Sequence, residues 1–337
     1  MRILAIETSC DETSVAILKM EGDIAVVDKE MTATQISTHQ AFGGVVPEVA
    51  ARMHVETLPA ILKEMGVTKD SVDAISATRG PGLVTSLRIG VDAARSLAYS
   101  WGKPLLGINH IEGHIAANWI GKASDAYAFP AVVLVVSGGH TELILMKDFG
   151  QYELLGATQD DAAGEAFDKV AKMLNLGYPG GPAVSKRAAN GDSKSWPLPR
   201  PMLHADNFDF SFSGLKTAVL YSVERKKDWT EKDTDNLCAS FQTAVIDTLV
   251  GKTARAAKVH GAKTVFLAGG VAANKGLREA LKIVVERDTE AQVVLPDLKW
   301  CTDNAAMIGM AAAFRLAKGE AHDWTKMEPD PNWELGR

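Results

Sequence analysis

Cysteine is scarce in this chain, which has three in 337 residues, at Cys10, Cys238 and Cys301. Their odd number and wide spacing exclude a disulfide framework and a Cys-x-x-Cys metal site, and they favour a reducing compartment. No apolar run approaches the ~18 residues that a membrane-spanning helix needs. The first apolar run, residues 3–6, ends at Glu7, so it does not form the core of a signal peptide. We therefore expect a cytoplasmic protein without a membrane partner.

Positive charge is also in short supply, because 36 Lys and Arg residues face 42 Asp and Glu residues and leave a net charge of −6. A negative total argues against a nucleic-acid partner, which usually meets a basic surface. The charge is unevenly distributed, however. Residues 182–232 hold 9 basic and 6 acidic side chains, so this segment carries 9 − 6 = +3 and the remainder −6 − 3 = −9. Local charge decides where a polyanion docks, so the total does not exclude one.

The composition, 46% hydrophobic and 23% charged, is typical of a globular protein. Because domains usually hold ~100–200 residues, the length predicts two of them. Hydrophobic periodicity predicts nearly the same order of elements twice. In the first part we expect strands at 2–7, 14–19, 23–30, 72–77 and 104–109, and helices at 49–65, 84–99 and 110–119. In the second part we expect strands at 131–136, 141–147, 151–158, 264–268 and 292–296, and helices at 161–174, 234–259, from 274, and at 302–316.

The first half reads βββαβαβα, the second follows nearly the same order, and each opens with a hairpin turn rich in Gly, Ser or Thr. This duplicated α/β unit resembles the actin/heat-shock/sugar-kinase (ribonuclease H-like) architecture, in which two lobes flank a nucleotide-binding cleft. We place the N-terminal half at residues 1–125 and the C-terminal half at 126–337, with an insertion at about 178–232.

A candidate metal site begins with His110-Ile-Glu-Gly-His114, because histidines four residues apart share one face of a helix and suit a single metal ion. The alternative is an ordinary pair of surface histidines. Glu112 lies roughly 200° around the helix from each histidine, which disfavours the general-base role of a metalloprotease. Asp303 is the candidate third ligand, although a carboxylate there also suits the start of a helix. Two imidazoles and a carboxylate suit iron or zinc and do not choose between them.

Two turns have the composition of ligand-binding loops. Residues 135–140, Val-Val-Ser-Gly-Gly-His, join two predicted strands, and their glycines allow the positive φ that points successive N–H groups at an anion. A plain hairpin turn is the alternative. The turn at residues 8–13 contains Asp11 and Glu12 among hydroxyl side chains, and such a loop can hold a phosphate-bound cation or orient a nucleophile.

Three further stretches suit a ligand. Asp161, Glu165 and Asp168 would share one helix face ahead of the glycine-rich residues 177–182, and Asp168 could accept hydrogen bonds from a ribose or an amine. The alternative is a solvated face paired with neighbouring lysines. After the strand at 264–268, two glycines allow close approach to a ligand, and Asn274 follows them either as a ligand contact or as a helix cap.

These stretches form part of an ordered set of motifs that runs from Met1 to about Leu316. The motifs are Ile6-Glu-Thr-Ser-Cys-Asp-Glu-Thr, Gly43-Gly-Val-Val-Pro-Glu, Gly80-Pro-Gly-Leu, His110-x-Glu-Gly-His, Val136-Ser-Gly-Gly-His-Thr, Asp160-Asp-Ala-Ala-Gly-Glu-Ala-Phe-Asp-Lys, Tyr178-Pro-Gly-Gly-Pro, Asp209-Phe-Ser-Phe-Ser-Gly-Leu-Lys and Cys301-Thr-Asp-Asn. Together they resemble the bacterial TsaD family of tRNA N6-adenosine threonylcarbamoyltransferases, formerly called glycoproteases or O-sialoglycoprotein endopeptidases.

The resemblance implies transfer of an L-threonylcarbamoyl group from threonylcarbamoyl-AMP to N6 of adenosine 37 in tRNAs that read ANN codons, with release of AMP. It implies one divalent metal ion, Fe²⁺ or Zn²⁺, on His110, His114 and Asp303, and it allows Mg²⁺ with a bound nucleotide. The implied ligand-binding residues are Val135, Val136, Ser137, Gly138, Gly139, Asp168, Gly181 and Asn274. Asp11 and Glu12 fall on the opening-loop motif, where we expect acid–base catalysis.

The resemblance also implies protein partners, namely a catalytically silent TsaB-like paralogue and a small TsaE-like P-loop ATPase. Three other functions stay open at this point. A free-standing ATPase or sugar kinase is disfavoured by the paired imidazoles, since Mg²⁺ prefers oxygen ligands. A metalloendopeptidase is disfavoured by the position of Glu112. A non-enzymatic subunit is disfavoured by the intact ligand motifs.

Overall fold

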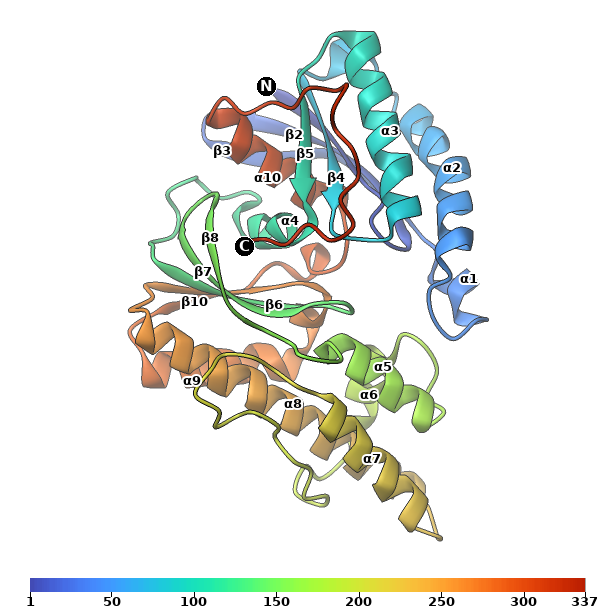
Figure 1. Ribbon diagram of the computed structural model, residues 1–337, viewed down its shortest axis with the longest axis vertical. Coiled ribbons are helices and arrows are strands. Elements are labelled where there is room, and N and C mark those ends of the chain that lie inside the picture. Colours follow the sequence, from blue (N-terminus) through green and yellow to red (C-terminus); the bar gives the residue numbers. More distant parts are fainter. Residues whose placement is uncertain (337) are drawn as a thin grey trace. The chain divides into compact units, whose positions relative to one another are not determined.

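The computed structural model describes residues 1–336 and divides into two compact units (Figure 1). The first unit comprises residues 1–127 and 299–335, and the second comprises residues 128–298 together with Gly336. The C-terminal segment therefore belongs to the first unit, whereas the sequence placed the whole of 126–337 in one half. The reason is the last helix, α10 (Ala305–Ala317), which packs on the first sheet.

The first unit is a five-stranded sheet with helices on both faces. Its strands are β1 (Arg2–Glu7), β2 (Glu12–Glu21), β3 (Ile24–Thr34), β4 (Ala74–Gly80) and β5 (Leu105–Asn109), in the spatial order β3-β2-β1-β4-β5. Its helices are α1 (Ile36–Gln40), α2 (Pro47–Glu64), α3 (Val84–Trp101), α4 (His110–Ala116) and α10, with 3₁₀ turns at Lys69–Ser71 and Ala117–Trp119. β1 pairs antiparallel with β2 and parallel with β4.

The second unit repeats this arrangement. Its strands are β6 (Ala131–Val136), β7 (Thr141–Asp148), β8 (Gln151–Ala157), β9 (Thr264–Ala268) and β10 (Gln292–Val294), in the order β10-β9-β6-β7-β8. Its helices are α5 (Ala163–Met173), α6 (Gly180–Ala188), α7 (Ser213–Arg225), α8 (Glu231–Val259) and α9 (Lys275–Asp288), with a 3₁₀ turn at Gly270–Ala273. A further 3₁₀ turn, Leu298–Trp300, follows β10 in the chain. β6 pairs antiparallel with β7 and parallel with β9, as β1 does with β2 and β4. The predicted duplication and fold class are confirmed.

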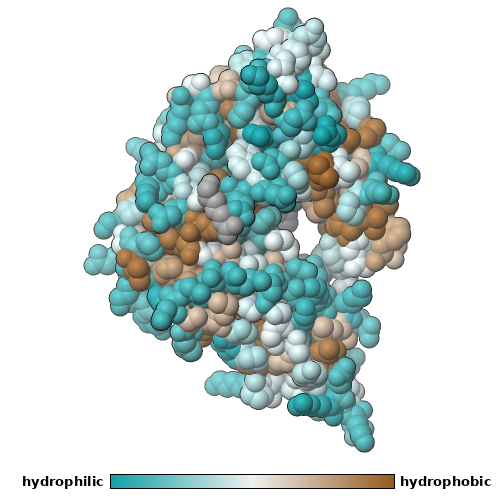
Figure 2. Space-filling model, viewed as in Figure 1, coloured by the Kyte–Doolittle hydropathy of each residue, from teal (hydrophilic) through white to brown (hydrophobic). Residues whose placement is uncertain are grey.

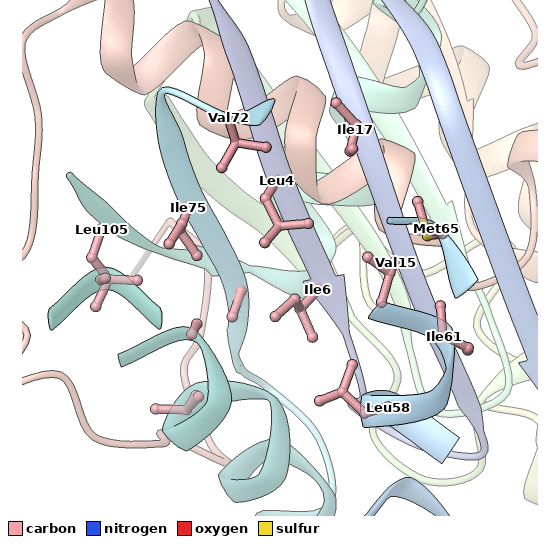
Figure 3. Packing of buried hydrophobic residues seen from close by; sticks show 14 of the residues in the cluster. Leu4, Ile6, Val15, Ile17, Leu58, Ile61, Met65, Val72, Ile75 and Leu105 are labelled. Atoms are coloured by element: carbon pink, nitrogen blue, oxygen red, sulfur yellow. The ribbon is translucent and has the colours of Figure 1, made fainter. Parts of the chain in front are cut away.

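The core of the first unit lies on both faces of β1. On one face, Leu4 and Ile6 pack toward Leu58 and Ile61 of α2 (Figure 3). Residues 3–6 have no exposed surface, which explains why this strand reads as a continuous apolar run rather than an alternating one. Complete burial of a leucine or isoleucine side chain contributes ~1.5–3 kcal/mol, so this layer is a main source of the unit's stability.

Helix α10 covers the other face of the first sheet. Residues 305–313 are buried on all sides, and a Cβ added at Gly309 would lie 2.4 Å from Leu18 Cδ1. The Ala305 N–H donates to Ser14 Oγ at 2.9 Å, which ties the start of the helix to β2. Because small residues allow this close approach, α10 completes the first unit despite its position at the end of the chain.

Most boundaries agree with the sequence prediction, but the segment after residue 177 is more ordered than expected. Helices α6 and α7 both lie within the predicted insertion, and α5 begins at Ala163 rather than Asp161. Hydrophilic side chains cover most of the face seen in Figure 2. Within the described part of the chain, every helix is too short or too polar to cross a membrane.

Candidate active site

The two histidines of the predicted metal site are placed by the start of α4. Asn109, the last residue of β5, caps this helix, because its Oδ1 accepts hydrogen bonds from the Ile111 and Glu112 N–H groups at 2.9 and 3.2 Å. His110 and His114 then lie one turn apart. Both are buried, and their ring centroids are 4.7 Å apart with the rings edge to face.

Asp303 completes the cluster from the loop before α10. Its Oδ1 lies 3.1 Å from His114 Nε2 and 3.5 Å from His110 Nε2, and the three candidate ligand atoms are all within 4.8 Å of one another. The helix cap at this position is the neighbouring Asn304, whose Oδ1 accepts from the Met307 N–H at 2.8 Å. Asp303 is therefore directed at the histidines, and the three predicted ligands form one group that could hold a metal ion.

A buried carboxylate behind His110 supports this fit. Glu7 Oε2 lies 3.1 Å from His110 Nδ1, and the Glu7 carboxylate also accepts from the Ser9 N–H and the Thr78 hydroxyl. Metal-bound histidines usually donate their second ring N–H to a carboxylate, which leaves the first nitrogen free for the ion. Sequence analysis gave Glu7 no role, although an acid at the end of a fully buried strand is a usable signal.

The electrostatics of the cluster favour a cation. Burial opposes a charged imidazole, yet the carboxylates of Asp303 and Glu7 outweigh this effect and raise the pKa of His110 to about 9. For His114 burial prevails, and its pKa is lowered despite Asp303. Negative charge is thus concentrated where the Nε2 atoms converge, as expected for a cation site.

The opening turn brings two more acids to the same place. Burial raises the pKa of Glu12 to about 9, and the neighbouring charges of Asp303 and Asp11 add to this effect. The Glu12 carboxylate accepts a hydrogen bond from Thr34 Oγ1 at 3.2 Å. Asp11 itself is mostly buried. The structure therefore brings the two predicted catalytic acids near the candidate metal ligands.

Glu112 serves a different purpose. Its Oε2 accepts from Arg315 Nε at 2.8 Å and pairs with Arg315 Nη2 at 2.7 Å, and its side chain is fully buried. Arg315 lies on α10, so this ion pair joins the helix that carries both histidines to the helix that follows Asp303. The helix-wheel expectation that Glu112 points away from the histidines agrees with this contact, and a metalloprotease-type base is absent from this position.

In the second unit, the turn between β6 and β7 is closed by Ser137. Its N–H donates to the His140 carbonyl at 2.8 Å, and its Oγ accepts from the His140 N–H at 3.1 Å. The side chains of Val135 and Val136 are fully buried, so only their backbone is available to a ligand.

The two glycines of this turn are open. Neither Gly138 nor Gly139 adopts the positive φ that a glycine allows. Apart from the glycine itself and its two chain neighbours, no heavy atom of the described chain lies within 4 Å of a Cβ built on either residue. These two residues therefore present accessible backbone rather than a left-handed turn.

Helix α5 brings three of the predicted ligand contacts together. The Gly164 N–H donates to the Ser137 carbonyl at 3.2 Å, which sets the start of α5 against the turn. Farther along, Asp168 Oδ1 accepts from the Gly180 N–H at 2.7 Å, and the next residue, Gly181, is open. Helix α5 therefore contacts the turn at its start and the Gly180–Gly181 segment farther along, through Asp168.

The predicted face of three acids is wrong in detail. Asp161 precedes α5, and its two carboxylate oxygens each lie 2.6 Å from a lysine, Lys169 and Lys216. Glu165 pairs with Lys169 at 2.8 Å. Of the three acids, Asp161 and Glu165 thus make internal ion pairs, and Asp168 is turned toward α6.

Asn274 acts as a helix cap, the alternative given by its sequence position. Its Oδ1 accepts from the Leu277 N–H at 2.9 Å, and its Nδ2 donates to Ser185 Oγ at 3.0 Å and Gln242 Oε1 at 2.9 Å. Ser185 lies on α6, so Asn274 is tied to the helix that begins with Gly180 and Gly181. A ligand contact for Asn274 stays a prediction.

The fold and these clusters define an α/β protein of the actin/heat-shock/sugar-kinase class with a candidate His₂Asp metal centre in its first unit. The sequence profile described as TsaD, tRNA N6-adenosine threonylcarbamoyltransferase, matches residues 27–310. The chain belongs to this family. It is a transferase of tRNA modification that forms threonylcarbamoyladenosine, and tRNA is its substrate.

Relatives with this name match over nearly the whole chain. The relative from Bacillus licheniformis is 50% identical over 322 residues, covering 94% of this chain and 92% of its own length. The relative from Thermosipho africanus is 48% identical over 340 residues, covering 99% and 100%. Among solved structures, HypF from T. kodakarensis is similar at a TM-score of 0.61 and 15% identity, covering 94% of this chain and 48% of that one. This last likeness concerns the fold alone.

Proposed function

We propose that this enzyme transfers the L-threonylcarbamoyl group of threonylcarbamoyl-AMP to N6 of adenosine 37 in tRNAs that read ANN codons. The observation that carries the proposal is the convergence of His110, His114 and Asp303 beside the turn of Asp11 and Glu12. In the reaction, a bond forms between N6 and the carbonyl carbon. The bond from that carbon to the phosphate oxygen breaks, AMP leaves with the electron pair, and the amine loses a proton.

In the first unit, His110, His114 and Asp303 would hold one divalent ion, with Fe²⁺ and Zn²⁺ both suited to this donor set. Such an ion supplies a Lewis acid or a template for substrate oxygens. Glu7 orients His110 through Nδ1. Asp11 accepts the proton of the amine, and Glu12 lies beside it. If Asp11→Ala retains near-normal transfer while Asp303→Ala abolishes it, the proton-acceptor role is wrong.

In the second unit, the Ser137–Gly139 amides would hold the leaving phosphate, since the two glycines are open. Asp168, Gly181 and Asn274 would bind the nucleoside, and a Mg²⁺ ion could accompany the phosphate. The proximity of the turn to Asp168 along α5 supports this assignment. Positioning of the reactants is the main contribution expected from these contacts.

Docking of tRNA would use the insertion. Helix α7 ends at Arg225, and its tip is hydrophilic in Figure 2. Lys226 pairs with Asp233 at 2.7 Å, which leaves Arg225 and Lys227 as the better phosphate contacts in this cluster. Charge-reversed Arg225→Glu and Lys227→Glu should weaken tRNA binding and reduce its salt dependence. Unchanged binding would remove α7 from the docking surface.

We also propose that the chain works with a TsaB-like paralogue and a TsaE-like ATPase in the cytoplasm, as the sequence resemblance implies. The decisive experiment is mass-spectrometric nucleoside analysis after incubation with synthetic threonylcarbamoyl-AMP and unmodified tRNA, with and without these partners. Formation of the modified adenosine together with AMP is expected. Nucleotide hydrolysis without any modified adenosine would favour an ATPase or kinase instead.

A further inference from the structure

A network of buried polar side chains in the first unit takes no part in the site described above. Gln35, His39 and His54 have at most 2% exposed surface. His39 accepts hydrogen bonds from two N–H groups of the segment Gly43-Gly-Val-Val-Pro-Glu, whose role the sequence did not indicate. His39 lies on α1 and His54 on α2. Buried polar groups are costly unless every one of them finds a partner, so this network calls for an explanation.

The hydrogen bonds of His54 fix its proton. His54 Nε2 lies 3.0 Å from the carbonyl oxygen of Cys10, which can only accept, so Nε2 carries the hydrogen. His54 Nδ1 lies 2.7 Å from Thr13 Oγ1. The hydroxyl therefore donates to Nδ1 of a neutral ring. Burial lowers the pKa of His54, in agreement with the neutral form.

The chain of hydrogen bonds continues from His54 to the start of α2. Gln35 Nε2 donates to the Ala50 carbonyl at 3.3 Å and approaches His54 Nδ1 at 3.4 Å, which orients the amide. Its Oε1 then accepts from His39 Nε2 at 3.1 Å, and His39 Nδ1 accepts from the Val46 N–H at 3.3 Å. Both histidines are thus neutral and carry their hydrogen on Nε2.

This network holds the opening turn at two backbone oxygens. One is the Cys10 carbonyl, bonded by His54, and the other is the Asp11 carbonyl, which accepts from the Gln35 N–H at 3.0 Å. The side chains of Asp11 and Glu12 extend from the backbone that is held in this way. A shift of either carbonyl would move the acids relative to Asp303.

We propose that His54 is a positioning residue for the transfer reaction. It fixes the backbone of residues 10–13 through the Cys10 carbonyl and the Thr13 hydroxyl, and it thereby directs Asp11 and Glu12 toward the reacting amine. The proposal rests on the proposed role of these acids. Small misplacements of catalytic groups cost up to ~100-fold in rate, so the effect should fall on kcat rather than on substrate binding.

The test compares two substitutions in the full chain with its partners. His54→Leu removes both ring nitrogens, whereas His54→Gln keeps an N–H donor that can reach the Cys10 carbonyl. We expect kcat to fall about 10- to 100-fold in the leucine variant. We further expect KM for threonylcarbamoyl-AMP and the bound metal to stay unchanged, and the glutamine variant to recover most of kcat. His204→Leu, at an exposed position in the second unit, is the matched control and should behave as wild type.

A wild-type kcat in His54→Leu would overturn the proposal, as would equal losses in the leucine and glutamine variants. If the leucine variant does not fold, the proposal is tested instead by the kcat of Thr13→Val and by ¹⁵N NMR of the wild-type histidines. We expect a lower kcat in Thr13→Val and a neutral His54 ring with hydrogen on Nε2. A His54 ring with hydrogen on Nδ1 would contradict the network. Absence of transfer in the wild type is a separate result that rejects the proposed function instead.

Discussion

The two units share one topology and differ at the turn that follows their first strand. In the first unit this turn is buried and rich in side-chain donors and acceptors, among them Ser9 and Asp11. In the second unit it consists of Gly138 and Gly139, which are open. The comparison supports our proposal that a single backbone frame carries a side-chain site for a cation in one unit and a backbone site for an anion in the other.

Packing of α3 explains part of this difference. A Cβ added at Gly90 would lie 2.4 Å from Thr8 Oγ1, and one added at Gly82 would lie 2.7 Å from the Ser9 carbonyl. Because these two glycines lack a side chain, the start of α3 can pack directly against the first turn and bury it. Once buried, its polar groups need internal partners, and the acids and histidines provide them.

The largest effect on the transfer rate is expected from a substitution of Asp303 in the first unit. Asp303→Asn removes the charged member of the candidate metal group, and a bound metal is worth several kcal/mol to such a transition state. We expect loss of the bound metal and a decrease in transfer of ~10³-fold or more. Elemental analysis and nucleoside mass spectrometry measure the two effects. Stoichiometric metal in this variant would show that the group is not the metal site.

A smaller effect is expected for Glu7→Gln, which keeps the shape of the carboxylate behind His110 but weakens its hold on Nδ1. Metal affinity should fall ~10–100-fold, as for other second partners of metal-bound histidines. Saturating metal should restore most of the transfer rate. The control is Glu153→Gln, an exposed acid of the second unit that pairs with Lys147. Equal metal affinity in both variants would contradict the role assigned to Glu7.

In the second unit, Asp168→Asn should give the opposite pattern to Asp303→Asn. The amide oxygen can still accept from Gly180, so α6 should remain in place. Loss of the charge-assisted hydrogen bond that we propose between Asp168 and the nucleoside should weaken binding of AMP or the adenylate about tenfold. Bound metal should be unchanged. Calorimetric titration measures the affinity, and loss of metal without loss of nucleotide binding would reverse the assignment of the two units.

The smallest effect is expected for Gly138→Ala. The added methyl group meets open space, so the free energy of unfolding should change by no more than ~0.5 kcal/mol. Nucleotide affinity should change little, because the amide donors remain. Gly164→Ala is the sensitive comparison, since its Cβ would lie 2.5 Å from the Ser137 carbonyl. Denaturant unfolding distinguishes them, and equal destabilisation would contradict the open turn.

Sequence reasoning recovered the features with a strong local signal. The alternation of elements predicted both sheets, and the spacing of His110 and His114 predicted their shared helix face. The orientation of Glu112 followed from the same helix geometry. Local patterns sufficed in these cases because each depends on the period of a single helix or strand.

The remaining features depend on contacts between distant residues. Glu7 and His110 are 103 positions apart, and His54 bonds to Cys10 across 44. The location of α10 was missed because a helix that is apolar on every side gives no indication of which sheet it covers. For the glycines of the second turn, residue type allows a positive φ without requiring it.

The central claim, metal-dependent acyl transfer by this chain, is tested most directly by removing the metal. The protein is stripped with a chelator, checked by elemental analysis, and assayed with threonylcarbamoyl-AMP and unmodified tRNA before and after addition of Fe²⁺ or Zn²⁺. The account predicts loss of modified adenosine in the stripped protein and its recovery with metal in the wild type but not in Asp303→Asn. Full formation of modified adenosine by verified metal-free protein would contradict it.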